Sequence, residues 1–326
     1  MTSTRLPPQG TFLGANNLQL FYQSWYPLPV RKDSSQSAVE GDLDVFDLQE
    51  DSADFPGSDI QAPTDIKGVL AIVHGLGEHS GRYCQIVSGL TAAGYAVFGF
   101  DNQGHGKSEG QRGHIDRWQD YRENTQAFLS LIRQQEPTAP LFLMGHSLGG
   151  LIVLDYVLRS SNSAAFQTLN VQGLIVSAPP FQPTIGTASR RRMVLARLLS
   201  RLLPRFSLNM GLNQGGLSRD PSVADQAAED PLTHSSVTLR WGSETLSTLA
   251  WVKDHIDQLT LPLLLTHGEA DPIISPSGSK MIFQQVNSRD KTLKIYPGSY
   301  HEPHNDLDAN TVVSDLLRWI EESLAR

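Results

Sequence analysis

The feature that most constrains the fold is a stretch of six residues, Gly145 to Gly150, between two apolar runs of different length. The run at 141–144 has the length of a buried strand, and the run at 151–158 has the length of a buried helix. The stretch reads Gly-His-Ser-Leu-Gly-Gly, which predicts that Ser147 lies where a strand turns sharply into a helix. Glycines two positions away on either side leave room for such a turn. A serine held there is exposed near the positive end of a helix dipole and is a candidate nucleophile.

Strand and helix patterns alternate over most of the chain. An alternating strand is expected at 18–26. Buried strands are expected at 68–73, 95–100, 171–177, 261–266 and 292–296, and helices at 83–93, 118–135 and 312–325. This alternation predicts an α/β fold, a mostly parallel sheet with helices on both faces. Ligands of such sheets bind at the carboxyl ends of the strands, which is where Ser147 is expected.

Two segments interrupt a single predicted domain of residues 1–326. Residues 31–64 hold nine acidic residues against two basic ones and few apolar ones, so we expect a flexible acidic insert that carries most of the net charge of −8. Its one apolar cluster, residues 43–48, is expected to belong to an unstructured, solvated loop, with docking on a partner or on the body of the protein as the alternatives. Residues 180–245 break the strand–helix alternation and are expected to form a helical cap over the active-site end of the sheet.

Within this cap, residues 190–206 form a basic amphipathic segment that Pro204 is expected to kink or end. Its leucines share one face and its arginines another; they are Leu195, Leu198, Leu199, Leu202 and Leu203, and Arg197, Arg201 and Arg205. Two interpretations are open and compatible. The leucines pack the helix onto the body, or the segment is a lid that touches a membrane surface and admits lipid.

Composition limits the partners and the compartment. An acidic net charge argues against nucleic acid as a partner. The single cysteine, Cys84, excludes an intrachain disulfide and fits a reducing compartment; we expect it to be a small buried residue rather than a nucleophile. No apolar run approaches the roughly 20 residues that span a bilayer. We therefore expect a cytoplasmic protein, peripheral to the membrane at most, and the histidine spacing suggests no metal site and no cofactor.

A serine hydroxyl needs a base to take its proton, and an imidazole oriented by a carboxylate is the usual one. In α/β-hydrolases the order along the chain is serine, acid, histidine. Asp271 follows the strand at 261–266 and is the expected acid, with Glu269 as its competitor. His301 follows the strand at 292–296 and is the expected base, with His304 as its rival.

The oxyanion of a tetrahedral intermediate needs hydrogen-bond donors. One is expected to be the backbone N–H of Leu148, directly after the candidate nucleophile. The other is expected from the loop after the strand at 68–73, with the N–H of Leu76 as the donor.

Together these motifs resemble the monoacylglycerol lipase group of the α/β-hydrolases, which includes lysophospholipase-like enzymes. The motifs that carry the resemblance are His74 to Tyr83, Asp101 to Gly110, Gly145 to Gly150, Leu217 to Asp220, Asp230 to Leu232, and Lys291 to His301. The resemblance covers roughly residues 66–322, cap included.

The resemblance implies Ser147, Asp271 and His301 as a catalytic triad and Leu76 and Leu148 as the oxyanion donors. By position it also implies that Glu78, Arg82 and His304 line the polar end of a substrate pocket. Two features depart from the family's pattern. The acidic insert is one, and the other is Ala227, which stands where mammalian-type members carry a tyrosine that helps hold glycerol.

The expected function is a serine carboxylic-ester hydrolase that cleaves monoacylglycerol to fatty acid and glycerol through an acyl-enzyme. The alternatives are a lysophospholipase or a broad-specificity short-chain esterase. A non-catalytic binding protein of the same fold is the alternative from another class.

Overall fold

The structure is a computed structural model that describes residues 8–28, 66–182, 199–211 and 214–326. The predicted acidic insert at 31–64 lies outside the described residues. The described part contains an eight-stranded sheet in the order β1-β2-β4-β3-β5-β6-β9-β10. Its strands are β1 (Gln9–Leu13), β2 (Gln19–Trp25), β3 (Val69–Val73), β4 (Ala96–Phe100), β5 (Leu141–His146), β6 (Val171–Ser177), β9 (Leu263–Gly268) and β10 (Lys291–Tyr296). From β4 to β10 all neighbours are parallel, whereas β2 runs antiparallel to both β1 and β4.

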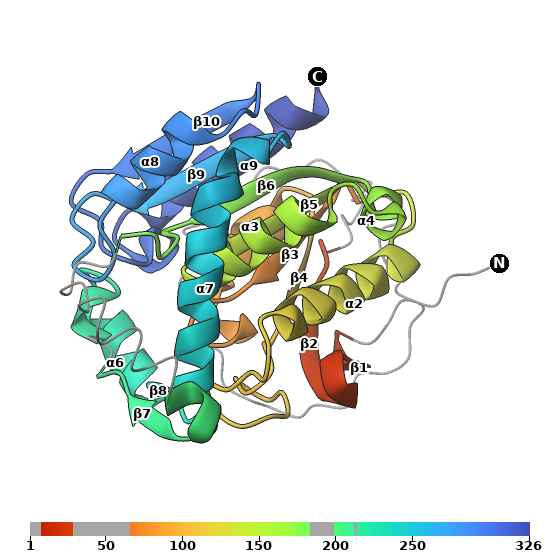
Figure 1. Cartoon of the computed structure of the whole chain (residues 1–326). Coiled ribbons are helices and arrows are strands. Elements are labelled where there is room, and N and C mark those ends of the chain that lie inside the picture. Colours follow the sequence, from red (N-terminus) through yellow and green to blue (C-terminus); the bar gives the residue numbers. More distant parts are fainter. Residues whose placement is uncertain (1–7, 29–65, 183–198, 212–213) are drawn as a thin grey trace, which may run out of the picture.

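Helices cover both faces of this sheet (Figure 1). They are α1 (Cys84–Ala92), α2 (Gln119–Gln135), α3 (Leu148–Ser160), α4 (Ala164–Leu169), α7 (Leu239–His255), α8 (Ser277–Gln285) and α9 (Ala309–Leu324), with short 3₁₀ turns η1 (Ala15–Asn17), η2 (Ser80–Arg82), η4 (Ile256–Gln258) and η5 (Pro303–Asn305). Successive strand residues point to opposite faces. Leu70 and Ile72 of β3 pack with α1 and α9, and Ala71 and Val73 pack with α2, α3 and α7. Burying both faces explains why the central strands are continuously apolar.

The predicted fold class is confirmed, and so are the predicted strands and helices of the sheet, to within a few residues at each end. Among the strands of the sheet and the helices that cover it, the sequence did not predict β1, α4, α7 and α8. One smaller expectation is wrong, because Cys84 is exposed rather than buried. It occupies the first position of α1, on the side of that helix away from the buried Ile86 and Leu90.

Between β6 and α7 the chain leaves the sheet (Figure 1). This segment carries β7 (Ser207–Asn209), η3 (Gln214–Gly216), α6 (Pro221–Glu229) and β8 (Ser236–Thr238), and β7 pairs antiparallel with β8. The predicted cap range of 180–245 ends inside α7, a continuous helix that packs against α3. Residues 199–202 are helical and the helix stops before Pro204, as expected for proline. Leu202 and Leu203 are 77% and 54% exposed, so these two leucines do not pack onto the body.

Leu195, Leu198 and Arg197 lie outside the described residues, so only the end of the predicted amphipathic segment is seen. Within the described ranges, no helix has both the length and the apolar character needed to cross a membrane.

Candidate active site

Ser147 stands at the junction of β5 and α3 in a conformation that side chains rarely adopt, with φ 50° and ψ −116°. Its N–H donates to the carbonyl O of Ser177 at 2.8 Å, which holds the turn against β6. Gly145 and Gly149, on either side of Ser147, are required because no side chain fits at either position. A Cβ at Gly149 would lie 2.0 Å from the carbonyl O of Val73, and one at Gly145 would lie 2.3 Å from the carbonyl O of Gly149. The turn therefore has the form of a nucleophile elbow.

Loops at the ends of two other strands bring an imidazole and a carboxylate to this serine. His301, after β10, has its Nε2 at 3.0 Å from the Ser147 Oγ. Its Nδ1 donates to the Oδ2 of Asp271, after β9, at 2.7 Å. This geometry leaves Nε2 free to accept the serine proton. Residues far apart in the sequence thus form one chain of hydrogen bonds, Asp271–His301–Ser147.

Asp271 is held as a buried anion. Its Oδ1 accepts from the backbone N–H groups of Ile273 and Ile274 at 2.8 and 2.9 Å, and its Oδ2 also accepts from His267 Nε2 at 3.1 Å. Burial alone would raise the pKa of this carboxyl, but these donors and His301 together lower it well below the ordinary value. For His301, burial would lower the pKa, and the hydrogen bond and charge of Asp271 outweigh it, so the pKa of His301 is raised. Asp271 therefore stabilises the imidazolium form of His301.

The two competing candidates, Glu269 for the acid and His304 for the base, do not take part in the hydrogen bonds that reach Ser147. Glu269 is exposed, whereas Asp271 is 6% exposed and bonded to His301. His304 is buried with its ring stacked on Tyr83 at 5.0 Å between centroids. Burial lowers the pKa of His304 to about 4, so it is neutral at physiological pH. Geometry therefore brings Asp271 and His301, and not their rivals, to the serine.

The two expected oxyanion donors belong to the same corner of the molecule. Leu148 is the first residue of α3, so its N–H has no partner inside the helix. Leu76 lies in the loop after β3 and lines the cavity next to Ser147. Within the described ranges, no hydrogen bond uses either N–H. The loop is fixed by the Gly75 N–H, which donates to Glu78 Oε1 at 2.5 Å.

A cavity of about 390 Å³ opens in front of Ser147 and His301, a size typical of small-molecule sites. The body of the protein contributes Glu78, Arg82 and Glu302 to its lining. The loop after β3 and the residues around Ser147 and His301 contribute as well, and the segment between β6 and α7 adds further residues, including Ala227 and Asp230. The described part of the predicted cap therefore lies over the serine. His304 is not among the residues that line the cavity.

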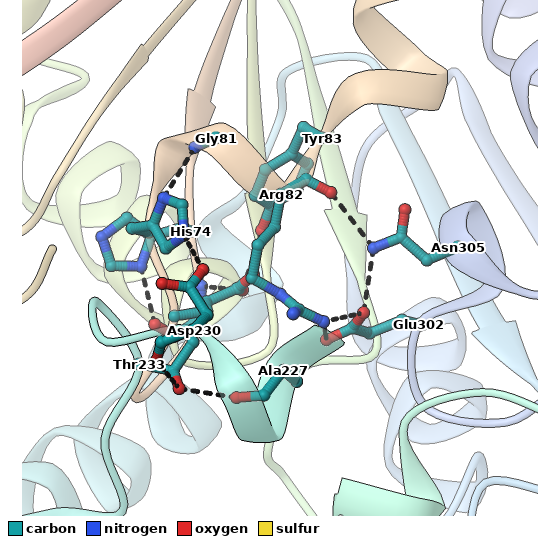
Figure 2. Close-up of polar contacts among 12 residues, drawn as sticks. His74, Gly81, Arg82, Tyr83, Ala227, Asp230, Thr233, Glu302 and Asn305 are labelled. Carbon is teal, nitrogen blue, oxygen red and sulfur yellow. Dashed lines mark hydrogen bonds and ion pairs between the residues drawn. The ribbon is translucent and has the colours of Figure 1, made fainter. Parts of the chain in front are cut away.

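Charged side chains gather at one end of this cavity (Figure 2). The Arg82 guanidinium points to Glu302 and donates to its two carboxylate oxygens at 2.9 and 3.2 Å, and Asn305 donates to the same carboxylate. Arg82 Nε also lies 3.6 Å from Glu78 Oε2. Burial and the negative charge of Glu302 raise the pKa of Glu78 to about 7, against the opposing effect of Arg82. Glu78 therefore changes its charge near neutral pH.

Sequence reasoning missed several residues of the site. Glu302 directly follows the base, and His146 directly precedes the serine. The His146 ring packs 5.0 Å from the His301 ring, and burial keeps its pKa well below the ordinary value. His267, which supports Asp271, lies near the end of β9, four residues before Asp271. Glu302 and His146 are each adjacent to a predicted site residue, and His267 is close to one, which is the only signal in the sequence that could have found them.

No group of three or more histidine, cysteine, aspartate or glutamate side chains is placed to hold a metal ion in the part of the chain that the structure describes.

Known proteins are similar to this chain in sequence and in fold. The family model described as serine aminopeptidase, S33, matches residues 64–308. The rat monoglyceride lipase is 32% identical over 79% of this chain and 84% of its own, and the monoacylglycerol lipase of Mycolicibacterium smegmatis is 32% identical over 82% and 92%. The crystal structure of the monoacylglycerol lipase of Paleococcus ferrophilus superposes with a TM-score of 0.70 at 32% identity, over 78% of this chain and 95% of that one.

The matched residues 64–308 include the strands from β3 to β10, the turn at Ser147, the segment between β6 and α7, and the loops that carry Asp271 and His301. The chain therefore belongs to the serine aminopeptidase S33 family of α/β-hydrolases, is a serine hydrolase, and within that family is a relative of the monoglyceride lipases.

Proposed function

We propose that this protein hydrolyses monoacylglycerol to fatty acid and glycerol, with Ser147 as nucleophile, His301 as base and Asp271 as the residue that orients it. The single observation that carries this mechanism is the Asp271–His301–Ser147 chain of hydrogen bonds. Ser147 Oγ attacks the ester carbonyl while His301 takes its proton. The N–H groups of Leu76 and Leu148 hold the oxyanion. His301 then gives the proton to the leaving glycerol oxygen, and a water activated by His301 releases the fatty acid from the acyl-enzyme.

The substrate class is supported by the cavity and by the relatives' names. Glu78 and Arg82 lie at the polar end, and in the described part of the chain Glu78 Oε2 is a buried oxygen without a hydrogen-bond partner, 3.6 Å from Arg82 Nε. A buried acceptor without a partner favours a ligand that brings a hydroxyl donor. We therefore assign the head-group hydroxyls to Glu78, with Arg82 holding its carboxylate in place. His304, behind the lining, supports this end by packing on Tyr83.

Charge favours glycerol over a phosphate-bearing head group. Glu78, Glu302 and Asp230 all line the cavity, and the Arg82 guanidinium is already bonded to Glu302. A phosphodiester would meet more negative than positive charge there, and unpaired like charges cost several kcal/mol. The lysophospholipase alternative is disfavoured for this reason. Broad ester specificity keeps one supporting observation, because the buried Ala227 places only a methyl group at its own position in the cavity wall.

A comparison of three substrates tests this assignment. We expect kcat/KM for monoolein to exceed that for lysophosphatidylcholine by about tenfold or more, since 1.4 kcal/mol of unfavourable electrostatics already gives a factor of ten. A short p-nitrophenyl ester serves as the reference for the chemical step, and Ser147→Ala measures background hydrolysis. Equal or faster turnover of lysophosphatidylcholine would contradict the head-group assignment while leaving the serine mechanism in place.

We also propose that the cap docks on a lipid surface. Five exposed apolar side chains follow one another on the segment at 202–210, namely Leu202, Leu203, Phe206, Leu208 and Met210, and we call them the cap patch. Arg201 and Arg205 on the same segment are exposed as well. Apolar side chains flanked by arginines are typical of surfaces that insert shallowly into anionic membranes.

Replacing Leu202 and Phe206 by serine should separate surface binding from chemistry. Burying one such side chain contributes about 1.5–3 kcal/mol, so the double variant is expected to bind vesicles of phosphatidylcholine and phosphatidylglycerol about tenfold or more weakly. Hydrolysis of monoolein in those vesicles should fall in parallel. Hydrolysis of the soluble short ester should not change. The control is Leu13→Ser, an apolar side chain on β1 that is 57% exposed. Unchanged vesicle binding by the double variant would refute this proposal.

A further inference from the structure

The loop that carries His301 is bonded to the cap as well as to the sheet. The N–H of His301 donates to the carbonyl O of Gly216 at 3.3 Å, and the N–H of Glu302 donates to the carbonyl O of Leu217 at 2.8 Å. Ser218 Oγ donates to the carbonyl O of Asn305 at 3.1 Å. The cap segment 216–219 thus runs alongside the loop that carries the base.

Asp306 closes this loop on itself. Its Oδ2 accepts from the N–H of Tyr300, the residue before His301, at 2.7 Å, and its Oδ1 accepts from the N–H of Leu307 at 2.7 Å. The carboxylate has no exposed side-chain surface. A buried anion of this kind is stable only when it is paired and hydrogen-bonded. By accepting from these two N–H groups, the Asp306 carboxylate fixes the backbone of the loop that carries His301.

The positive charge that pairs with Asp306 comes from the cap. Arg219 Nε donates to Asp306 Oδ1 at 2.9 Å, and the Arg219 backbone N–H reaches the same oxygen at 3.2 Å. The other end of the guanidinium binds Asp308 and the Oγ of Ser299, which itself donates to Asp308 at 2.7 Å. One arginine therefore bridges points before and after His301 in the loop.

We propose that Arg219 is a positioning residue for His301 and acts through Asp306, so that the cap holds the base loop in its reactive geometry. This inference rests on the proposed role of His301 as the base. Arg219 is not among the residues that line the cavity at Ser147, so its effect reaches the serine only through the position of the imidazole. A displacement of about 1 Å at a reacting group can cost on the order of a hundredfold in rate.

The test is the rate at which a fluorophosphonate labels Ser147, measured well below the melting temperature of each variant. Arg219→Gln is expected to slow labelling by about tenfold to a hundredfold and to lower kcat for the short ester equally, with KM changed less than about threefold. Arg219→Lys keeps the charge beside Asp306 but loses the fork that also reaches Ser299 and Asp308, so it should label at an intermediate rate. Arg117→Gln is the matched control, because Arg117 is an exposed arginine that pairs with the buried Asp120 and does not line the cavity; it should label like wild type.

Labelling by Arg219→Gln at the wild-type rate would overturn the proposal, even with a lowered melting temperature, because the arginine would then serve stability alone. Equal slowing by Arg117→Gln would overturn it too. If Arg219→Gln does not fold, Arg219→Lys decides, and a wild-type labelling rate for that variant would count against the proposal. A failure of the proposed function is distinguishable, because the wild-type protein itself would then carry no label on Ser147.

Discussion

Replacing Ser147 with alanine is expected to lower kcat for ester hydrolysis by about a million-fold while the protein stays folded. Ser147 supplies the attacking atom, and among the residues that the structure describes no other hydroxyl is bonded to His301 Nε2. Alanine keeps the Cβ that already occupies the strained backbone position, with φ 50°. The elbow therefore loses one oxygen and one hydrogen bond, a change of about 1 kcal/mol in stability.

Three measurements check this expectation on the same samples. Turnover of monoolein and of the short ester gives the loss of activity, and thermal unfolding shows whether the fold persists. Incubation with a fluorophosphonate followed by peptide mapping should place one adduct on Ser147 of the wild type and none on the variant. Substantial activity in a folded variant would show that another residue is the nucleophile.

The elbow was predictable from the sequence because its determinants are local. The strand, the tight turn and the helix occupy consecutive residues, and Gly145 and Gly149 mark positions where the backbone of a neighbouring strand or turn approaches within reach of a Cβ. The sheet was predictable for a related reason. Its central strands are buried on both faces, so each is a short apolar run between turn residues.

The choice between close candidates was not predictable, because it depends on contacts made across the fold. Asp271 and Glu269 occupy the same turn after β9, and only the chain's return through β10 shows that His301 faces Asp271. The pairing of Arg82 with Glu302 joins residues 220 positions apart. β1 was missed since Phe12 is its only side chain buried against the core, so the strand lacks an apolar pattern.

The surroundings of the cap patch were also not predictable from the sequence. The leucines of this segment have helical spacing, which is compatible with packing on the body and with contact with lipid. The spacing of apolar residues predicts that the helix has an apolar face, but the neighbouring elements of the fold decide what covers that face. In the described part, Leu202 and Leu203 face solvent, which removes the first interpretation for these two residues alone.

Replacing Asp271 with asparagine is expected to lower kcat by about 10⁴-fold and to move the acid limb of the pH profile. The side-chain amide has nearly the size of the carboxylate, but its NH₂ group donates where the carboxylate oxygen accepted from His301 Nδ1. The imidazole must then keep its proton on Nε2, the atom that faces Ser147 at 3.0 Å. In that tautomer His301 cannot accept the serine proton, although every residue of the site remains in place.

The direction of the pH shift follows from the charge that is removed. In the wild type, the effect of Asp271 outweighs the effect of burial, so the pKa of His301 is raised. As the pH is lowered, kcat/KM therefore begins to fall at a pH above the ordinary pKa of histidine. Without the carboxylate, burial dominates and the pKa of His301 falls. The residual activity of Asp271→Asn should therefore persist to lower pH than wild-type activity does. The measurement is kcat/KM for the short ester between about pH 5 and 9.

Glu269→Gln is the matched control for this experiment, because it removes a carboxylate from the same turn, two residues away, at an exposed position. Its kcat and its acid limb should equal those of the wild type, since an exposed charge is screened by solvent and makes no contact with His301. A large loss of activity in Glu269→Gln together with a small one in Asp271→Asn would reassign the acid to Glu269. An unshifted acid limb in Asp271→Asn would mean that Asp271 orients the imidazole without setting its pKa.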